Sequence, residues 1–231
     1  MPIVLAAIDR PPSHSQLVYE RLKQVLQNGG VSGGSLLSEA DLARQLGVST
    51  TPVHEAVVRL ASEGFVEALP RRGVRVVHLA PRDIAEIFEL REALEVEVVR
   101  LAVTRASNQD LSALHEFVAS GQEALDRDDY HAFNQTDVAL HDALAGAAAN
   151  RRLQQSINDL RVWVQRIRHA AAEQHFGPPS RPAKALAEHR QLVRAVQRRD
   201  APTAENLIRK HISSLKDEIL EHMSTHHIDF I

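Results

Sequence analysis

Residues 38–66 place the strongest constraint on the fold, because their pattern predicts two short helices joined by a tight turn. Ser38 can cap the first helix, over residues 39–46, through its hydroxyl oxygen. Gly47 stands where a helix ends in a left-handed residue, a conformation that glycine adopts without strain. The second helix is expected over about residues 51–63. The apolar side chains of this stretch fall on one side: Leu42, Leu46, Val48, Val53, Val57 and Leu60.

A helix pair of this kind leaves one face of the second helix free to enter the major groove of DNA. The candidate DNA-contacting residues of the helix are Ser49, Thr50, Thr51, His54 and Arg59. Glu55 and Val58 lie on the same free face. The alternative is an ordinary helical hairpin inside a core, because short helix pairs joined by glycine are common. This stretch alone favours neither interpretation.

The segments on both sides of the helix pair add the remaining parts of a winged helix. Residues 15–27 show an amphipathic helical pattern. After Gly64, the runs FVEAL and VRVVHL flank PRRG, which predicts a two-stranded ribbon with a basic turn at Arg71, Arg72 and Gly73. Two arginines at a hairpin tip can contact the phosphate backbone or the minor groove of DNA. We therefore expect a winged helix–turn–helix domain over residues 15–78, preceded by a loose tail over residues 1–14.

Composition excludes several classes of protein. The chain has no cysteine, so it forms no disulfide, thiolate zinc site or cysteine nucleophile. No apolar run approaches the ~20 residues needed to cross a bilayer, and the apolar start lacks the basic residues of a signal peptide, so we expect a cytoplasmic protein. Residues 15–78 hold seven Lys or Arg and six Asp or Glu, so charge by itself does not indicate nucleic-acid binding.

Beyond a short linker over residues 79–82, strand patterns stop and helical patterns follow. Six helices are expected, at residues 83–105, 108–126, 130–147, 152–175, 183–198 and 202–223. Long helices with short connections indicate an antiparallel all-α bundle, over residues 83–225, followed by a tail over residues 226–231. The fold class is therefore mainly α, with one small β-hairpin.

Four residues of the expected bundle have the chemistry of a metal site. Asp137 and His141 are four residues apart and share a helix face, while His189 and His211 lie in the fifth and sixth helices. One carboxylate and three imidazoles suit Zn²⁺, Ni²⁺, Mn²⁺ or Fe²⁺. The alternative is chance, because the chain has 13 histidines and an Asp–His pair at this spacing usually forms a local hydrogen bond. Spacing alone leaves both interpretations open.

The motifs in combination resemble a known family. EADLARQLGVSTTPVHEAVVRLASEGFV followed by RRGVRVV resembles the winged-helix domain of GntR-type bacterial transcription regulators. The bundle, which begins with IFELREALE, resembles the FadR-type ligand-binding domain called FCD, and the resemblance covers about residues 15–223. It implies a homodimer, formed through the bundle, that binds a double-stranded DNA operator, usually as a repressor. It also implies a divalent metal held by Asp137, His141, His189 and His211.

The second helix departs from the family pattern. Relatives usually read S-R-T-P-V-R-E-A here, whereas this chain has Thr50 and His54 in place of the two arginines, and Ala40 where a basic residue is often found. An arginine that contacts guanine through two hydrogen bonds contributes ~1–3 kcal/mol of discrimination. The operator preferred by relatives therefore need not be the operator of this chain.

These features predict a DNA-binding regulator whose helical domain binds a metal and a small carboxylate metabolite. Arg91 is the candidate to pair with the metabolite, because a guanidinium binds carboxylates through two hydrogen bonds. Its alternative role is an ion pair with Glu95, four residues on. Two other functions remain open: a ligand sensor with weakened DNA binding, and a metal-dependent hydrolase. The hydrolase lacks an H-E-x-x-H motif and an evident general base.

Overall fold

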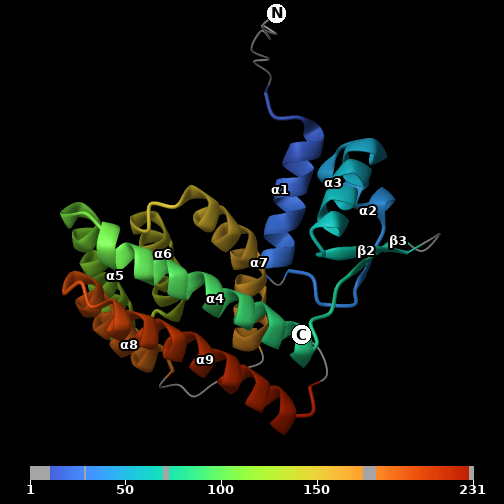
Figure 1. The fold of residues 1–231 in the computed structure, drawn as a ribbon. Helices are drawn as coiled ribbons and strands as arrows, with labels where there is room; N and C mark the ends of the chain where they lie inside the picture. Colours follow the sequence, from blue (N-terminus) through green and yellow to red (C-terminus); the bar gives the residue numbers. More distant parts are fainter. Residues whose placement is uncertain (1–10, 29, 70–72, 174–180, 229–231) are drawn as a thin grey trace, which may run out of the picture. The chain divides into compact units, whose positions relative to one another are not determined.

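The structure, a computed structural model, describes residues 11–28, 30–69, 73–173 and 181–228. The chain divides into two compact units between Leu79 and Ala80. The first, the head, holds three helices and a small sheet, and the second is all-helical, so the expected mainly-α architecture is confirmed (Figure 1). No helix in the described ranges combines the length and apolar character needed to cross a membrane.

The head is a winged helix. Its helices are α1 (His14–Gln27), α2 (Glu39–Leu46) and α3 (Thr50–Ser62), and its strands are β1 (Leu36–Leu37), β2 (Val66–Leu69) and β3 (Gly73–Val76). The three strands form an antiparallel sheet in the order β1-β3-β2. Strand β1 was not predicted: Leu36 pairs with Arg75, which turns the expected two-stranded ribbon into a three-stranded sheet.

The residues expected to delimit the helix–turn–helix do so. The backbone N–H of Asp41 donates to the Ser38 hydroxyl at 3.3 Å, which caps α2. Gly47 ends α2 with φ +67°, in the left-handed region that suits glycine. Helix α3 packs on α1 through an apolar core made by Val18, Leu22, Leu26, Val53, Val57, Leu60 and Phe65. This core holds α3 by one side only and leaves its other side exposed.

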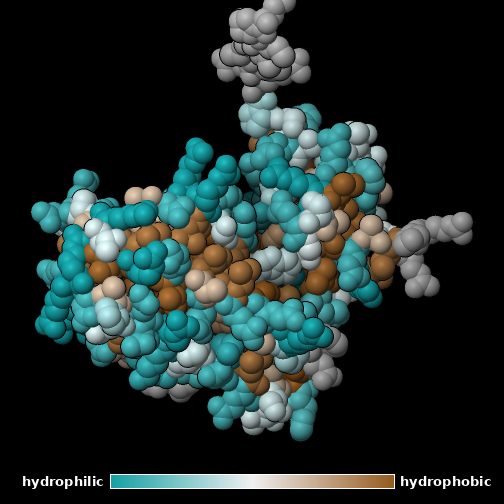
Figure 2. All heavy atoms as spheres, in the orientation of Figure 1, coloured by the Kyte–Doolittle hydropathy of each residue, from teal (hydrophilic) through white to brown (hydrophobic). Residues whose placement is uncertain are grey.

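The second unit consists of six helices with short connections: α4 (Pro81–Arg105), α5 (Asn108–Asp126), α6 (Tyr130–Ala147), α7 (Arg151–Glu173), α8 (Arg181–Gln197) and α9 (Ala201–Thr225). Helix α4 contacts α6, α7, α8 and α9. The core is aliphatic, with Ile84, Val99, Leu140, Leu192, Ile208 and Ile212 buried. In Figure 2 hydrophobic side chains gather along the middle of this unit, between hydrophilic edges.

Some expected boundaries were displaced. Helix α4 begins at Pro81, so residues 81–82 of the expected linker are helical, because proline fits the first turn of a helix and the Asp83 carboxylate accepts from the Ala80 N–H at 2.8 Å. Helix α1 begins at His14, inside the expected tail, because the Ser13 hydroxyl caps it. Helices α8 and α9 also begin one or two residues earlier than expected.

Candidate metal centre and nucleic-acid interface

Three helices bring the four candidate metal ligands together. Asp137 and His141 lie one turn apart on α6, His189 on α8 and His211 on α9, and each side chain is almost fully buried. One ligand atom from each residue lies within 4.8 Å of the others. The Nε2 atom of His189 is 3.3 Å from Nε2 of His211 and 3.4 Å from Oδ1 of Asp137. The helical spacing seen in the sequence therefore corresponds to one cluster in the interior of the bundle.

Two further carboxylates orient the imidazoles from outside the cluster. Nδ1 of His141 donates to Glu95 at 2.5 Å, and Nδ1 of His211 donates to Glu188 at 2.8 Å. A proton held on Nδ1 leaves Nε2 as a lone pair, and these bonds therefore direct both Nε2 lone pairs to the cluster. Sequence reasoning missed both carboxylates as partners of histidine. The signal for Glu95 was a charged residue on the inward face of its helix, while Glu188 gave none.

Burial and nearby charges shift the pKa values of Asp137, His189 and His211. Burial by itself would raise the pKa of Asp137, but Arg168, which is ion-paired with its carboxylate, and the nearby histidines hold that pKa well below its usual value. Burial lowers the pKa of His189 well below its usual value and also lowers the pKa of His211. An ionised carboxylate beside neutral imidazoles is the state in which these side chains bind a cation.

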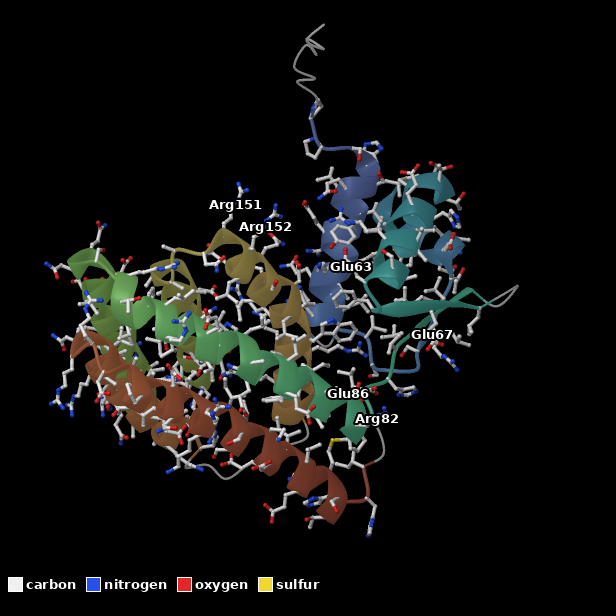
Figure 3. All side chains as sticks on the ribbon, in the orientation of Figure 1. Glu63, Glu67, Arg82, Glu86, Arg151 and Arg152 are labelled. Carbon is white, nitrogen blue, oxygen red and sulfur yellow. The ribbon has the colours of Figure 1, made fainter. Side chains whose placement is uncertain are left out.

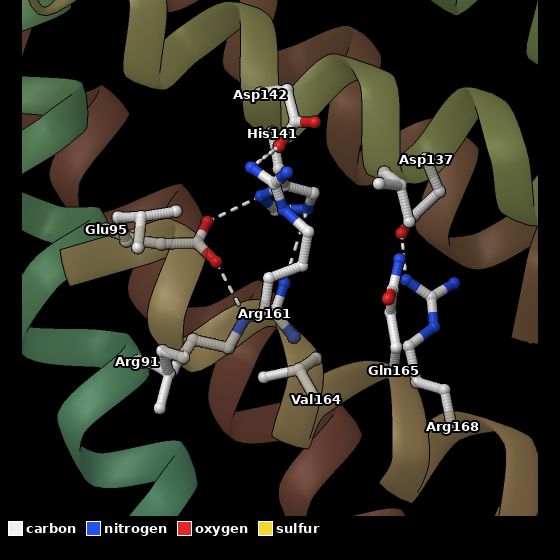
Figure 4. A pocket seen from close by; sticks show the side chains of 12 residues that line it. Arg91, Glu95, Asp137, His141, Asp142, Arg161, Val164, Gln165 and Arg168 are labelled. Carbon is white, nitrogen blue, oxygen red and sulfur yellow. Dashed lines mark hydrogen bonds and ion pairs between the residues drawn. The ribbon is translucent and has the colours of Figure 1, made fainter. Parts of the chain in front are cut away.

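A cavity of about 40 Å³ lies beside the cluster (Figure 4). Helices α4, α6 and α7 supply its lining, with Arg91, Asp137, His141 and Arg168 among the polar residues. Its apolar lining comes from Val138, Ile157, Leu160 and Val164. Because one water takes about 10–15 Å³ in this measure, the cavity admits a few heavy atoms at a time. A small polar molecule could thus reach His141 and Asp137 from the cavity.

Arg91 fulfils its alternative role and retains a free donor. Its Nε donates to Glu95 at 2.6 Å, which is the expected ion pair, and its Nη2 lies 3.5 Å from Nε2 of His141. Its buried Nη1 has no hydrogen-bond partner among the described residues. A buried donor without a partner costs ~1–3 kcal/mol, so Nη1 is suited to receive an acceptor that enters the cavity.

The other arginines of the cavity are already paired. Arg161 and Arg168, both on α7, line it, and Arg161 forms an ion pair with Asp142 while Arg168 pairs with Asp137. Residues 161–168 of α7 hold three arginines in all. The third, Arg166, is buried and does not line the cavity.

The DNA-contacting candidates of the head lie in different surroundings. Thr50 and Thr51 are exposed in the first turn of α3, and Ser49 is its N-cap residue. His54 lies 3.1 Å from Glu39 of α2. Arg59 faces α1 instead: its guanidinium lies 3.6 Å from the ring centroid of Tyr19.

Further contacts hold Arg59 against α1. It donates to Gln16 at 2.9 Å and to Glu63 at 3.3 Å. Glu63, labelled in Figure 3, also accepts from Tyr19 at 2.8 Å and from Lys23 at 2.7 Å. Arg59 therefore belongs to the contacts that pack α1 against α3, a role that its sequence position did not indicate.

Of the three residues expected to form the turn of the wing, the structure describes only Gly73. Gly73 begins β3 with φ +90°, and a Cβ there would lie 2.5 Å from the carbonyl oxygen of Leu37 in β1. Glycine at this position therefore permits the close approach of two strands. Arg71 and Arg72, the expected basic tip, lie outside the described residues.

Comparisons with known proteins agree with this division of the chain. Residues 14–76 match the family described as bacterial regulatory proteins, gntR family, and residues 86–214 match the FCD domain. A curated relative, the HTH-type transcriptional repressor RspR of Escherichia coli K12, is 24% identical over 205 residues, covering 89% of this chain and 88% of the relative. An uncharacterised HTH-type regulator of Streptomyces ambofaciens is 28% identical over 203 residues, covering 87% and 83%.

Solved structures share the fold. That of E. coli McbR/YncC has a TM-score of 0.77 and 25% identity, covering 92% of this chain and 99% of the other. A GntR regulator from Rhodococcus sp. RHA1 has a TM-score of 0.72 and 22% identity, covering 91% and 99%. The two family matches together span most of the chain. The chain therefore belongs to the GntR family of bacterial transcription regulators with a C-terminal FCD domain, and it is a regulator and not an enzyme.

Proposed function

We propose that this regulator is a homodimeric repressor whose FCD domain binds a divalent metal and a small carboxylate, and that the carboxylate changes its affinity for an operator. The metal ligands are Asp137, His141, His189 and His211. The carboxylate occupies the adjoining cavity and is bound by Arg91. A two-fold dimer suits the paired half-sites that helix–turn–helix proteins bind.

The convergence of the four ligand atoms is the observation that supports the metal site. An ion with tetrahedral bonds of about 2.0–2.1 Å holds its ligand atoms about 3.3–3.4 Å apart. Two of the separations between ligand atoms in the cluster have these values, 3.3 and 3.4 Å. The donor set of three nitrogens and one oxygen, with Glu95 and Glu188 on the outer nitrogens, fits a resident Zn²⁺, Ni²⁺, Mn²⁺ or Fe²⁺.

Residues of the cavity supply the carboxylate site. When bound, the metal would provide a positive centre that attracts the anionic oxygen of a ligand. Nη1 of Arg91 supplies a buried donor from α4, which is the helix that follows the head directly. The apolar side chains of Val138, Leu160 and Val164 exclude water and restrict the site to small acids.

The DNA contacts follow from the exposed side of α3 and from the wing. Ser49, Thr50, Thr51 and His54 are assigned to the major groove, and Arg71, Arg72 and Gly73 to the backbone or minor groove. Because Arg59 is held by Gln16, Glu63 and Tyr19, we assign it a supporting role behind α3.

Elemental analysis combined with native mass spectrometry tests the metal site on purified full-length protein. We expect one divalent ion per chain and the mass of a dimer. His141→Ala and His189→Ala should lose the ion, while His131→Ala, an exposed position on the same helix as His141, should retain it. Full metal content in His141→Ala would contradict the ligand assignment.

An electrophoretic shift assay on the protein's own upstream region tests the regulatory function. At low salt, metal-loaded protein should retard this DNA, and an effective carboxylate should change the amount retarded. Arg91→Lys keeps the charge beside Glu95 but removes the planar guanidinium, so it should bind DNA while responding less to the carboxylate. Absence of any shift, with or without metal, would contradict operator binding.

A further inference from the structure

The centre of the outward face of α3 carries an exposed apolar side chain. Val53, Ala56, Val57 and Leu60 are buried against the head, which fixes the inward direction of the helix. At 100° per residue, the opposite direction passes through Thr51, Glu55 and Val58. Val58 is 55% exposed, one of few large hydrophobic residues in the described chain with this exposure. The helix therefore presents an isopropyl group on the side that faces away from the core of the head, about two turns after Thr51.

The basic side chains of α3 lie to either side of this centre. His54 is turned toward α2 by Glu39, at 3.1 Å. Arg59 is held against α1 by the Tyr19 ring. Helix α3 is described in full and contains no other basic residue, so no cation occupies the centre of its outward face. Reading of guanine by arginine or lysine is thus not available from this part of the helix.

The apolar Val58 and the acidic Glu55 on this face favour a pyrimidine base over guanine. In the major groove, the 5-methyl group of thymine is the apolar feature that a side chain such as valine can contact, while an acceptor edge pressed against valine loses its hydrogen bonds to water. Glu55 lies three residues before Val58, on the same face, and its carboxylate repels the acceptor N7 and O6 atoms of guanine. Apolar contact and charge therefore disfavour guanine at the same place.

We propose that Val58 is a specificity-determining residue of the DNA-binding head and that it reads the 5-methyl group of a thymine in each operator half-site. The inference rests on operator binding by α3. Removing a single buried methyl group weakens binding by about three- to fivefold, so the contact contributes to specificity more than to overall affinity.

Deoxyuridine scanning tests this contact, because deoxyuridine differs from thymidine only in lacking the methyl group. A duplex bound by the full-length protein is first selected from a random pool at low salt, and each thymine is then replaced singly. Affinity is measured by fluorescence anisotropy. For the unmodified protein we expect one thymine in each half-site at which the replacement weakens binding about three- to fivefold.

The variant Val58→Ala assigns the effect to the side chain. It should bind the original duplex about as weakly as the unmodified protein binds the deoxyuridine duplex, and it should not distinguish the two duplexes. Leu17→Ala removes an apolar side chain of similar exposure from α1 and should leave the discrimination intact. Because Val58 is exposed, its replacement is expected to preserve folding, which the metal content and melting temperature of the variant check.

Two results would overturn the proposal in different ways. If the protein selects a duplex but tolerates deoxyuridine at every thymine, or if Val58→Ala remains as sensitive as the unmodified protein, then Val58 reads no methyl group while operator binding stands. If no duplex is selected from the pool at low salt, both this contact and operator binding are refuted.

Discussion

Glu95 accepts hydrogen bonds from Arg91 and from His141 and is buried with both. Burial would raise the pKa of its carboxyl group, but Arg91 and His141 outweigh burial and lower it, so Glu95 is ionised. The same carboxylate therefore holds the proposed carboxylate-binding arginine and orients a proposed metal ligand. Sequence reasoning presented the ion pair of Arg91 with Glu95 and anion binding by Arg91 as alternatives, whereas the geometry makes them compatible.

Glu95→Gln removes the charge and keeps the size of the side chain. Because Arg91 would stay buried without its counter-charge, we expect the free energy of unfolding to fall by about 3–5 kcal/mol. Loss of the carboxylate behind His141 should weaken metal binding about 10–100-fold. Urea unfolding and chelator competition measure the two effects. Glu97→Gln, an exposed residue on the same helix, should change stability by less than about 1 kcal/mol, and equal effects at both positions would contradict this role.

Asp142 is the negative partner of Arg161 in the cavity, where it would compete with the proposed carboxylate ligand for this arginine. Burial raises the pKa of Asp142 and outweighs the attraction of Arg161, which lowers it. The negative charge of the ionised Asp142 carboxylate is therefore only partly balanced by Arg161. Asp142→Asn should release Arg161 and strengthen acetate binding to metal-loaded protein about fivefold, as removal of one nearby like charge predicts. Calorimetric titration measures this change. Asp159→Asn, on α7, is the control, and unchanged acetate affinity in Asp142→Asn would refute the competition.

Helices and turns were predictable where a local signal defined them. Ser38 and Gly47 delimit α2, and the amphipathic patterns gave the six helices of the FCD domain, because these features depend on neighbours in sequence. The ligand cluster followed from inward positions on three helices. Strand β1 escaped prediction, since two leucines form a strand only through pairing with β3, which lies far along the chain. Glu188 and the orientation of Arg59 likewise depend on contacts with distant residues.

Pairing of β1 with β3 depends on Gly73. Its φ of +90° disfavours any other residue, and a Cβ would lie 2.5 Å from the Leu37 carbonyl oxygen. Gly73→Ala should therefore destabilise the sheet by about 1–3 kcal/mol, seen as faster amide hydrogen exchange in the strands of the head. Gly47→Ala shares a positive φ but meets no atom within 4 Å, so it isolates the steric part of the effect. Slower exchange in Gly73→Ala than in Gly47→Ala would contradict this role.

Helix α4 links the two proposed functions in the chain. It begins at Pro81, directly after the head ends at Leu79, and it carries Arg91 and Glu95. At 1.5 Å per residue, Glu95 lies about 21 Å along the helix from Pro81. The proposed carboxylate at Arg91 would therefore act on the helix that follows the head directly in the chain. This arrangement gives ligand binding a direct covalent route to the head, whose operator affinity it is proposed to change.

Stability of the metal-free protein should depend on pH through the buried cluster. The pKa values of His189 and His211 are lowered in the folded chain, so below about pH 6.5 the unfolded chain binds protons at these residues that the folded chain does not. Stability contributed by the neutral imidazoles is thus present above this pH and lost as pH falls. Asp137, whose pKa is also lowered, extends the loss below about pH 4, where its carboxylate protonates more readily in the unfolded chain.

Urea unfolding in the presence of a chelator, from pH 8 to pH 5, measures this dependence. We expect the unfolding free energy to decline progressively below about pH 6.5. His189→Gln removes one of the two groups, so its decline should be shallower than that of the unmodified protein, whatever its stability at pH 8. His131→Gln removes an exposed histidine and should keep the full slope. The slope of the unfolding free energy with pH arises only from a difference in bound protons between the folded and the unfolded state. An equal slope in His189→Gln and in the unmodified protein would therefore show that the buried imidazoles do not control acid stability.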